Sequence, residues 1–88
     1  MRFEYDQQKS ASNKEKHGID FEEAQALWDD VDRIELPASY RDEPRFFVIG
    51  TALGKVWTSV ITYRGSNTRI ISVRRAREDE VRRYHEDD

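Results

Sequence analysis

Three stretches rich in apolar and β-branched residues follow one another between residues 45 and 75, separated only by short turn signals. Gly54 stands before the second stretch, and a Gly-Ser-Asn turn stands before the third. Stretches of this length joined by such short turns form neighbouring antiparallel strands. A fourth stretch ends at Pro37, where a turn-like segment begins. The sequence therefore predicts an antiparallel four-stranded meander made of VDRIEL, RFFVIGTAL, KVWTSVITYR and TRIISVRR.

Two helices are predicted before this sheet. Asp6 is suited to cap the first one, which would run to about His17, and Gly18 supplies the left-handed residue that commonly ends a helix. Ala11 is the only apolar residue between positions 7 and 17, so this helix has almost no core-facing stripe. We expect its neighbours or a partner to hold it at the surface.

The second helix is predicted in the stretch GIDFEEAQALWDD. Asp20 and Glu23, three residues apart, resemble a capping box in which Asp replaces Ser or Thr. Apolar residues then recur at helical spacing, so one face of this helix should pack on the sheet. These core-facing residues are Phe21, Ala24, Leu27 and Trp28.

The two ends of the chain complete the predicted fold. Phe3 and Tyr5 alternate with charged residues, which indicates a short first strand. A last helix is predicted from about Ala76 to His85, with an acidic triplet in its first turn, where the helix dipole favours anions. No repeat or linker divides the chain, so residues 1–88 are predicted to form one small α+β domain.

The charge of the chain is unevenly distributed. The formal net charge is −3, yet residues 64–83 hold seven arginines against three acidic residues. Salt confines the influence of each charge to about 8–10 Å, so a local basic stripe can bind phosphate on a protein that is acidic overall. Net charge therefore does not exclude a nucleic-acid ligand.

Composition also bears on compartment and cofactors. The absence of cysteine excludes disulfides and thiolate zinc sites and agrees with a reducing cytoplasm. The chain becomes charged within a few residues of its start, and no apolar run approaches membrane-spanning length, so we expect a cytoplasmic protein without membrane contact. Asp29, Asp30 and Asp32 lack the spacing of a recognised metal site. We predict no metal and no cofactor.

Two stretches carry a family resemblance. FEYDQQKSASNKEKHGIDFEEA has an aromatic-Asp start, then Lys, Asn and Lys-His-Gly before a Phe-Glu-x-Ala helix. In RGSNTRIISVRRAREDEVRRY, an Ile-Ile-Ser strand runs into Arg-Arg-Ala and a helix with Glu and Tyr. Both resemble signatures of the BrnT toxin family and keep their order. Tyr5 and Trp28 stand where many relatives have Trp and Phe, so each site keeps an aromatic ring, while residues 37–44 diverge more.

The resemblance implies a toxin of a bacterial type II toxin–antitoxin system, with a RelE-like α+β fold and endoribonuclease activity. Its implied partners are RNA and a DNA-binding antitoxin of the BrnA kind, so that contact with DNA would be indirect. Two alternatives stay open. One is a catalytically silent module whose arginine stripe holds an acidic segment of such a regulator, and the other is a nucleic-acid-binding regulator that acts without cleavage.

RNA can be cleaved by attack of its own 2′-hydroxyl on the adjacent phosphate. This reaction needs a base for the hydroxyl proton, cations for the developing charge and an acid for the leaving oxygen. Guanidinium suits the phosphate role. Consecutive strand residues face opposite ways, which places Arg74 and Arg75 on opposite sides of the sheet. We predict these two arginines as the phosphate site, with Arg64, at the far end of the preceding strand, as a further member.

Three residues are candidates for proton transfer. Glu80 and Tyr84 share one face of the last helix, and the ordinary pKa of about 6.5 suits His17 to the role. Structural roles compete, because Tyr84 can pack inward and His17 can meet the carbonyl end of its helix. Predicted RNA-binding residues are Lys9, Lys14, Arg69 and Arg77. We expect carboxylates of the antitoxin to cover part of residues 64–83 in place of phosphates.

Overall fold

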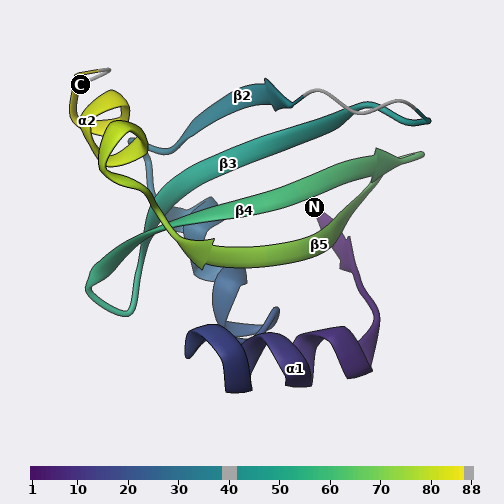
Figure 1. Ribbon diagram of the computed structural model, residues 1–88. Helices are drawn as coiled ribbons and strands as arrows, with labels where there is room; N and C mark the ends of the chain where they lie inside the picture. Colours follow the sequence, from purple (N-terminus) through teal and green to yellow (C-terminus); the bar gives the residue numbers. More distant parts are fainter. Residues whose placement is uncertain (39–41, 87–88) are drawn as a thin grey trace.

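The structure is a computed structural model that describes residues 1–38 and 42–86, over which five strands form one mixed sheet (Figure 1). Strands β2 to β5 are antiparallel neighbours in chain order, and β1 pairs in parallel with β5. The predicted sheet of four antiparallel strands is wrong, because β1 adds a fifth strand, which runs parallel to β5. The bounds are β1 (Arg2–Glu4), β2 (Ile34–Ala38), β3 (Arg45–Ala52), β4 (Lys55–Arg64) and β5 (Asn67–Arg75).

The missed pairing has a physical reason. Residues Arg2–Glu4 pair with residues 67–69, more than sixty positions away in the chain. Alternation indicates that such a short segment is extended, but it carries no information about which strand it joins. In the segment ASYRDEP, predicted as turn-like, Ala38 belongs instead to the strand that spans Ile34–Ala38, and residues 39–41 lie outside the described residues.

The prediction of two N-terminal helices also needs correction. The first is an α-helix, α1 (Gln7–His17), whereas the second is a short 3₁₀-helix, η1 (Glu23–Asp29). The buried residues Phe21, Ala24 and Leu27 recur every three positions, which matches the three residues per turn of a 3₁₀-helix. The capping box is confirmed, because the amides of Asp20 and Glu23 each donate to the other's carboxylate, at 3.0 and 2.7 Å.

Polar side chains hold α1 against the rest of the protein. The side-chain amide of Asn13 donates to the carbonyl oxygens of Ile19 and Val73, at 2.8 and 2.9 Å, and accepts from the Val73 amide at 3.2 Å. Ser10 accepts from the Phe21 amide. Asn13 thus occupies the edge of β5 beyond the point where β1 ends. The expectation that neighbours hold this apolar-poor helix is confirmed.

The main core lies between one sheet face and the α1–η1 side of the molecule. It includes Ile19, Phe21, Leu27, Val48, Trp57, Ile61, Ile70 and Val73. The last helix, α2 (Glu78–Glu86), lies on the other side and begins two residues later than predicted (Figure 1). None of the helices within the described residues is long and apolar enough to cross a membrane.

Candidate functional site

The end of β5 presents one arginine to each face of the sheet. Arg74 lies opposite Thr58 on β4, and Arg75 lies opposite Trp57. The exposed Arg75 guanidinium lies over the Trp57 ring, 5.6 Å from its centroid, on the core side. Arg74 turns instead toward α2. The predicted placement on opposite faces is confirmed.

Arg74 is held by a bidentate ion pair with the first turn of α2. Its two terminal nitrogens donate to the two carboxylate oxygens of Glu80, at 2.7 and 2.9 Å. Glu80 also accepts from the Thr58 hydroxyl at 3.0 Å and from the Arg77 amide at 2.8 Å. Arg74 Nη1 also donates to the Arg75 carbonyl oxygen at 3.3 Å, and one N–H of Nη2 together with Nε–H lies outside these contacts, because a guanidinium has five donors. The carboxylate therefore fixes the direction of the cation without using all its donors.

These contacts set the charge states of the pair. Burial by itself would raise the pKa of the Glu80 carboxyl, but hydrogen bonds from Arg74, the Arg77 amide and Thr58 outweigh it and lower the pKa to about 2. The hydrogen bond with Glu80 raises the pKa of the Arg74 guanidinium. Both groups are charged at neutral pH. The geometry favours Glu80 as a residue that positions Arg74 rather than one that accepts a proton.

The Tyr84 hydroxyl is engaged by Asp30, whereas a role in proton transfer needs a hydroxyl that can reach the substrate. Its hydroxyl donates to Asp30 at 2.6 Å, and the same carboxylate oxygen accepts from the amide and hydroxyl of Thr51. Chiefly through the bond with Asp30, the pKa of Tyr84 is raised to about 12. Burial would raise the pKa of Asp30, yet hydrogen bonds from Tyr84, the Asp32 amide and Thr51 lower it to about 2. This cluster anchors α2 to the end of η1.

Acid should destabilise the protein through Glu80 and Asp30. Their ordinary pKa values of 4.5 and 3.8 fall to about 2 on folding, so the unfolded chain takes up protons first as pH falls. Stability from these groups is then complete above about pH 4.5 and is lost toward about pH 2. Urea unfolding across this range should show the decline, with a shallower slope for Glu80→Gln. The exposed Glu78→Gln serves as control, and an equal slope in all three proteins would contradict the assignment.

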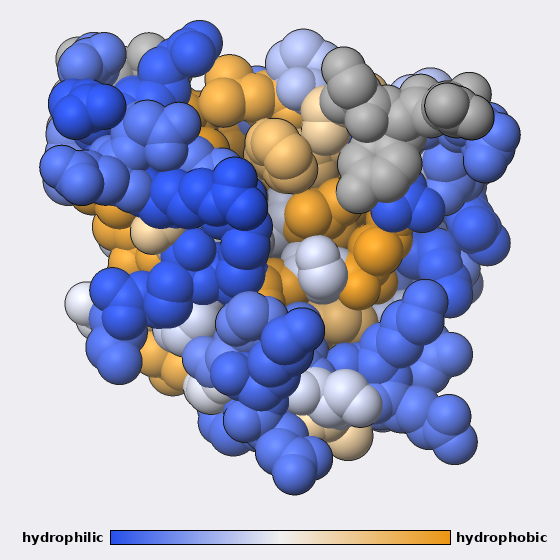
Figure 2. Space-filling view, viewed as in Figure 1, coloured by the Kyte–Doolittle hydropathy of each residue, from blue (hydrophilic) through white to orange (hydrophobic). Residues whose placement is uncertain are grey.

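An apolar surface adjoins Arg74 on this face of the sheet. Cross-strand pairing puts Leu36, Phe47 and Val60 side by side, and the Arg74 guanidinium lies 5.9 Å from the Phe47 ring centroid. Figure 2 shows hydrophobic surface in a hollow beside the hydrophilic side chains of α2. Sequence reasoning missed Thr58 and Phe47 as neighbours of Arg74, because their proximity depends on strand register. Apart from alternation along each strand, the sequence carries no signal for this register.

The other predicted residues do not converge on Arg74. Arg64 pairs with Glu43 at 3.9 Å, and it lies about 20 Å from the Arg74 end of β4, at roughly 3.3 Å per residue. Arg69 pairs with Glu4 at 2.9 Å, and Lys14 with Glu23 at 2.8 Å. His17 is half-buried at the end of α1, on the side of the molecule away from α2 (Figure 1). Lys9 and Arg77 are exposed.

Metal ligands are likewise not gathered in one place. Among residues 1–38 and 42–86, no group of three or more His, Asp or Glu side chains is placed to hold a metal ion. Asp30, one of the three neighbouring aspartates that lack the spacing of a metal site, accepts hydrogen bonds from Thr51, Tyr84 and the Asp32 amide. What the Arg74 region offers chemically is a fixed cation beside an apolar surface.

The comparison with protein families decides what kind of protein carries this site. The pattern of the family described as ribonuclease toxin, BrnT, of type II toxin-antitoxin system matches residues 5–80. The chain belongs to this family. The resemblance drawn from the two signatures is thus confirmed, and membership of the BrnT family implies an antitoxin partner and an RNA target. The matched range includes Arg74, Arg75 and Glu80, while β1 and Tyr84 lie outside it. A comparison with curated proteins found no match.

Proposed function

We propose that this chain is the toxin of a bacterial type II toxin–antitoxin system and cleaves RNA in the cytoplasm as a metal-independent endoribonuclease. Membership of the BrnT family supports the class of protein. The observation that carries the assignment of the site is Arg74, whose guanidinium is fixed by Glu80 and lies beside Phe47. A phosphate would meet the cation while an adjacent base lies on the apolar surface.

In the proposed reaction, the 2′-hydroxyl oxygen of RNA attacks the adjacent phosphorus and the bond to the 5′-oxygen breaks. Arg74 stabilises the negative charge that develops on the phosphate oxygens, which is the kind of interaction that contributes most to such reactions. Glu80 holds the guanidinium in a fixed direction, and Tyr84 holds α2 in place through Asp30. Because both groups are engaged, solvent accepts the 2′-hydroxyl proton and returns one to the leaving oxygen. Arg75 extends the cationic edge.

The antitoxin is proposed to neutralise the toxin by covering the Arg74 region. Carboxylates suit this task because guanidinium binds carboxylate and phosphate with the same parallel hydrogen bonds. In this arrangement a BrnA-like antitoxin would carry the DNA-binding activity, and this chain would contact DNA only through it. A stable complex of this kind would bury on the order of 1,600 Å².

One observation favours a second candidate, a catalytically silent module that binds the antitoxin. Both predicted proton-transfer groups of α2 are held by structural partners, Glu80 by Arg74 and Tyr84 by Asp30. A site without a free acid or base can bind an anion without cleaving it. Cleavage by the purified chain separates the two candidates.

The purified chain is expected to cut RNA in the presence of EDTA and to leave 2′,3′-cyclic phosphate and 5′-hydroxyl ends, because the nucleophile is the 2′-oxygen of the substrate. Mapping of RNA ends measures both. The matched control is the same RNA carrying 2′-O-methyl groups, which should be resistant. Cleavage of the methylated RNA, or a requirement for Mg²⁺, would contradict the mechanism. No cleavage together with tight antitoxin binding would establish the silent module.

A further inference from the structure

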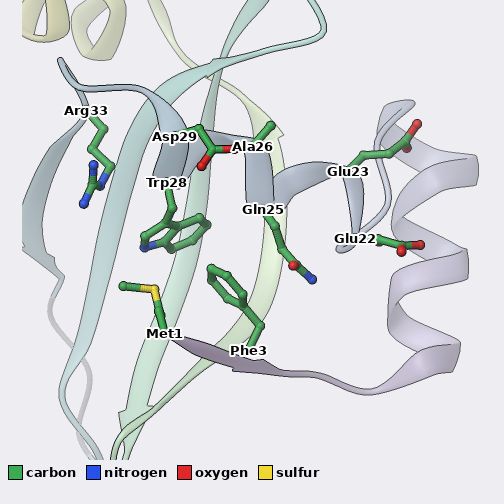
Figure 3. Close-up of a pocket in the computed structure, with 9 residues that line it drawn as sticks. All are labelled: Met1, Phe3, Glu22, Glu23, Gln25, Ala26, Trp28, Asp29 and Arg33. Atoms are coloured by element: carbon green, nitrogen blue, oxygen red, sulfur yellow. The ribbon is translucent and has the colours of Figure 1, made fainter.

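A second site lies on the η1 side of the sheet, away from Arg74. Phe3 and Trp28 meet edge to face there, with ring centroids 4.9 Å apart, and both rings are half-buried (Figure 3). With Met1 and Gln25 they line an open cavity of about 590 Å³, named here the Trp28 pocket. This volume falls within the roughly 300–1,000 Å³ typical of ligand pockets.

The edge of the Trp28 pocket is acidic. Glu22 and Asp29 are exposed, and neither carboxylate takes part in a hydrogen bond or ion pair with another described residue. Glu23 also lines the pocket but is bound to Lys14. One cation, Arg33, lines it too, and its guanidinium donates to the Asp30 carbonyl oxygen at 3.2 Å. Overall, residues 20–35 hold seven carboxylates against this single arginine.

The aromatic and acidic groups together define the ligand. Carboxylates repel phosphate, so RNA is disfavoured in this pocket. A cation over the face of an indole ring is attracted by the π-electrons, and tryptophan is the most favourable ring for this contact. Arginine adds a planar fork of donors that can reach carboxylates while it stacks on the ring. Its aliphatic stem also suits an apolar wall.

We propose that the Trp28 pocket receives an arginine side chain from a basic segment of a protein partner. The guanidinium lies against Trp28 and donates to Asp29, the stem contacts Met1 and Phe3, and Glu22, at the other end of η1, adds to the negative charge of the pocket edge (Figure 3). The identity of the partner as the antitoxin rests on the proposed function. A partner anchored here contacts the toxin on the side of the sheet opposite to Arg74, so this contact does not compete with RNA.

The probe for this site is the peptide acetyl-Ala-Arg-Ala-amide, titrated into the ¹⁵N-labelled chain without RNA or antitoxin. The Trp28 indole N–H signal should shift and saturate. The Trp57 indole is an internal control, because it is 2% exposed and donates to the Ala52 carbonyl oxygen. The double variant Glu22→Gln, Asp29→Asn should bind about fivefold more weakly, as expected for the loss of one exposed ion pair and of a further negative charge at the pocket edge. Glu15→Gln, an exposed change on α1, should bind unchanged.

Equal binding of acetyl-Ala-Gln-Ala-amide, or equal affinity of the double variant, would overturn the pocket assignment. So would shifts of the Trp57 indole as large as those of Trp28. The double variant should cleave RNA at the rate of the unaltered chain, so failure of the ribonuclease proposal leaves this result unaffected. Equal neutralisation of both proteins by the antitoxin would overturn the identity of the partner.

Discussion

Replacement of Asn13 by alanine is expected to lower the free energy of unfolding by about 3–5 kcal/mol, because it removes the partner of several buried backbone groups at once, each worth roughly 1–3 kcal/mol. The Asn13 side chain, which is 7% exposed, bonds the amide and carbonyl of Val73 and the carbonyl of Ile19. Thermal unfolding followed by circular dichroism should show a midpoint lower by roughly 15 °C or more.

The matched control for this prediction is Ser12→Ala, an exposed change one position away on the same helix. It should shift the midpoint little, since exposed substitutions away from special contacts usually stay within about 0.5 kcal/mol. Similar small losses for both variants would show that α1 is attached by contacts other than Asn13. A large loss for Asn13→Ala alone would establish that one polar side chain joins α1, the segment that precedes η1 and the edge of β5.

Replacement of Arg74 by glutamine is expected to reduce RNA cleavage by about 100-fold or more, the usual cost of removing a donor that stabilises developing negative charge. Arg74→Lys should recover little of the activity, because an ammonium keeps the charge but cannot reproduce the bidentate geometry. Initial rates on one RNA, measured with proteins shown to be folded at the assay temperature, test both variants. Thermal midpoints separate lost catalysis from lost folding, since Glu80 loses its partner as well.

Arg82→Gln is the control, because it makes the same change of charge at an exposed position on α2. Its rate should stay within about twofold of the unaltered chain, since screening confines the influence of an exposed charge. An equal fall in both variants would mean that general attraction of RNA, and not the fixed guanidinium, carries the activity. Full activity of a folded Arg74→Gln protein would remove this arginine from the proposed mechanism.

Much of the local structure was predictable because it depends on near neighbours in the chain. The Asp20 and Glu23 capping box forms as their spacing predicts. Alternation along β5 places Arg74 and Arg75 on opposite faces, as the two-residue repeat of an extended chain requires. The candidate site was predictable only in part, since the sequence named Arg74 and Glu80 as site residues but not the bidentate contact between them.

What the sequence determined by itself was therefore the positions of the antiparallel strands, the turns between them and the family. Tertiary structure decided which distant groups meet: β1 beside β5, Asn13 on Val73, and Tyr84 on Asp30, 54 positions away. Such contacts depend on register and on how helices dock, and each side chain could locally serve several partners. Burial of polar groups selects among them, because an unpaired buried donor or acceptor is costly. The ion pair of Arg74 and Glu80 was decided in this way.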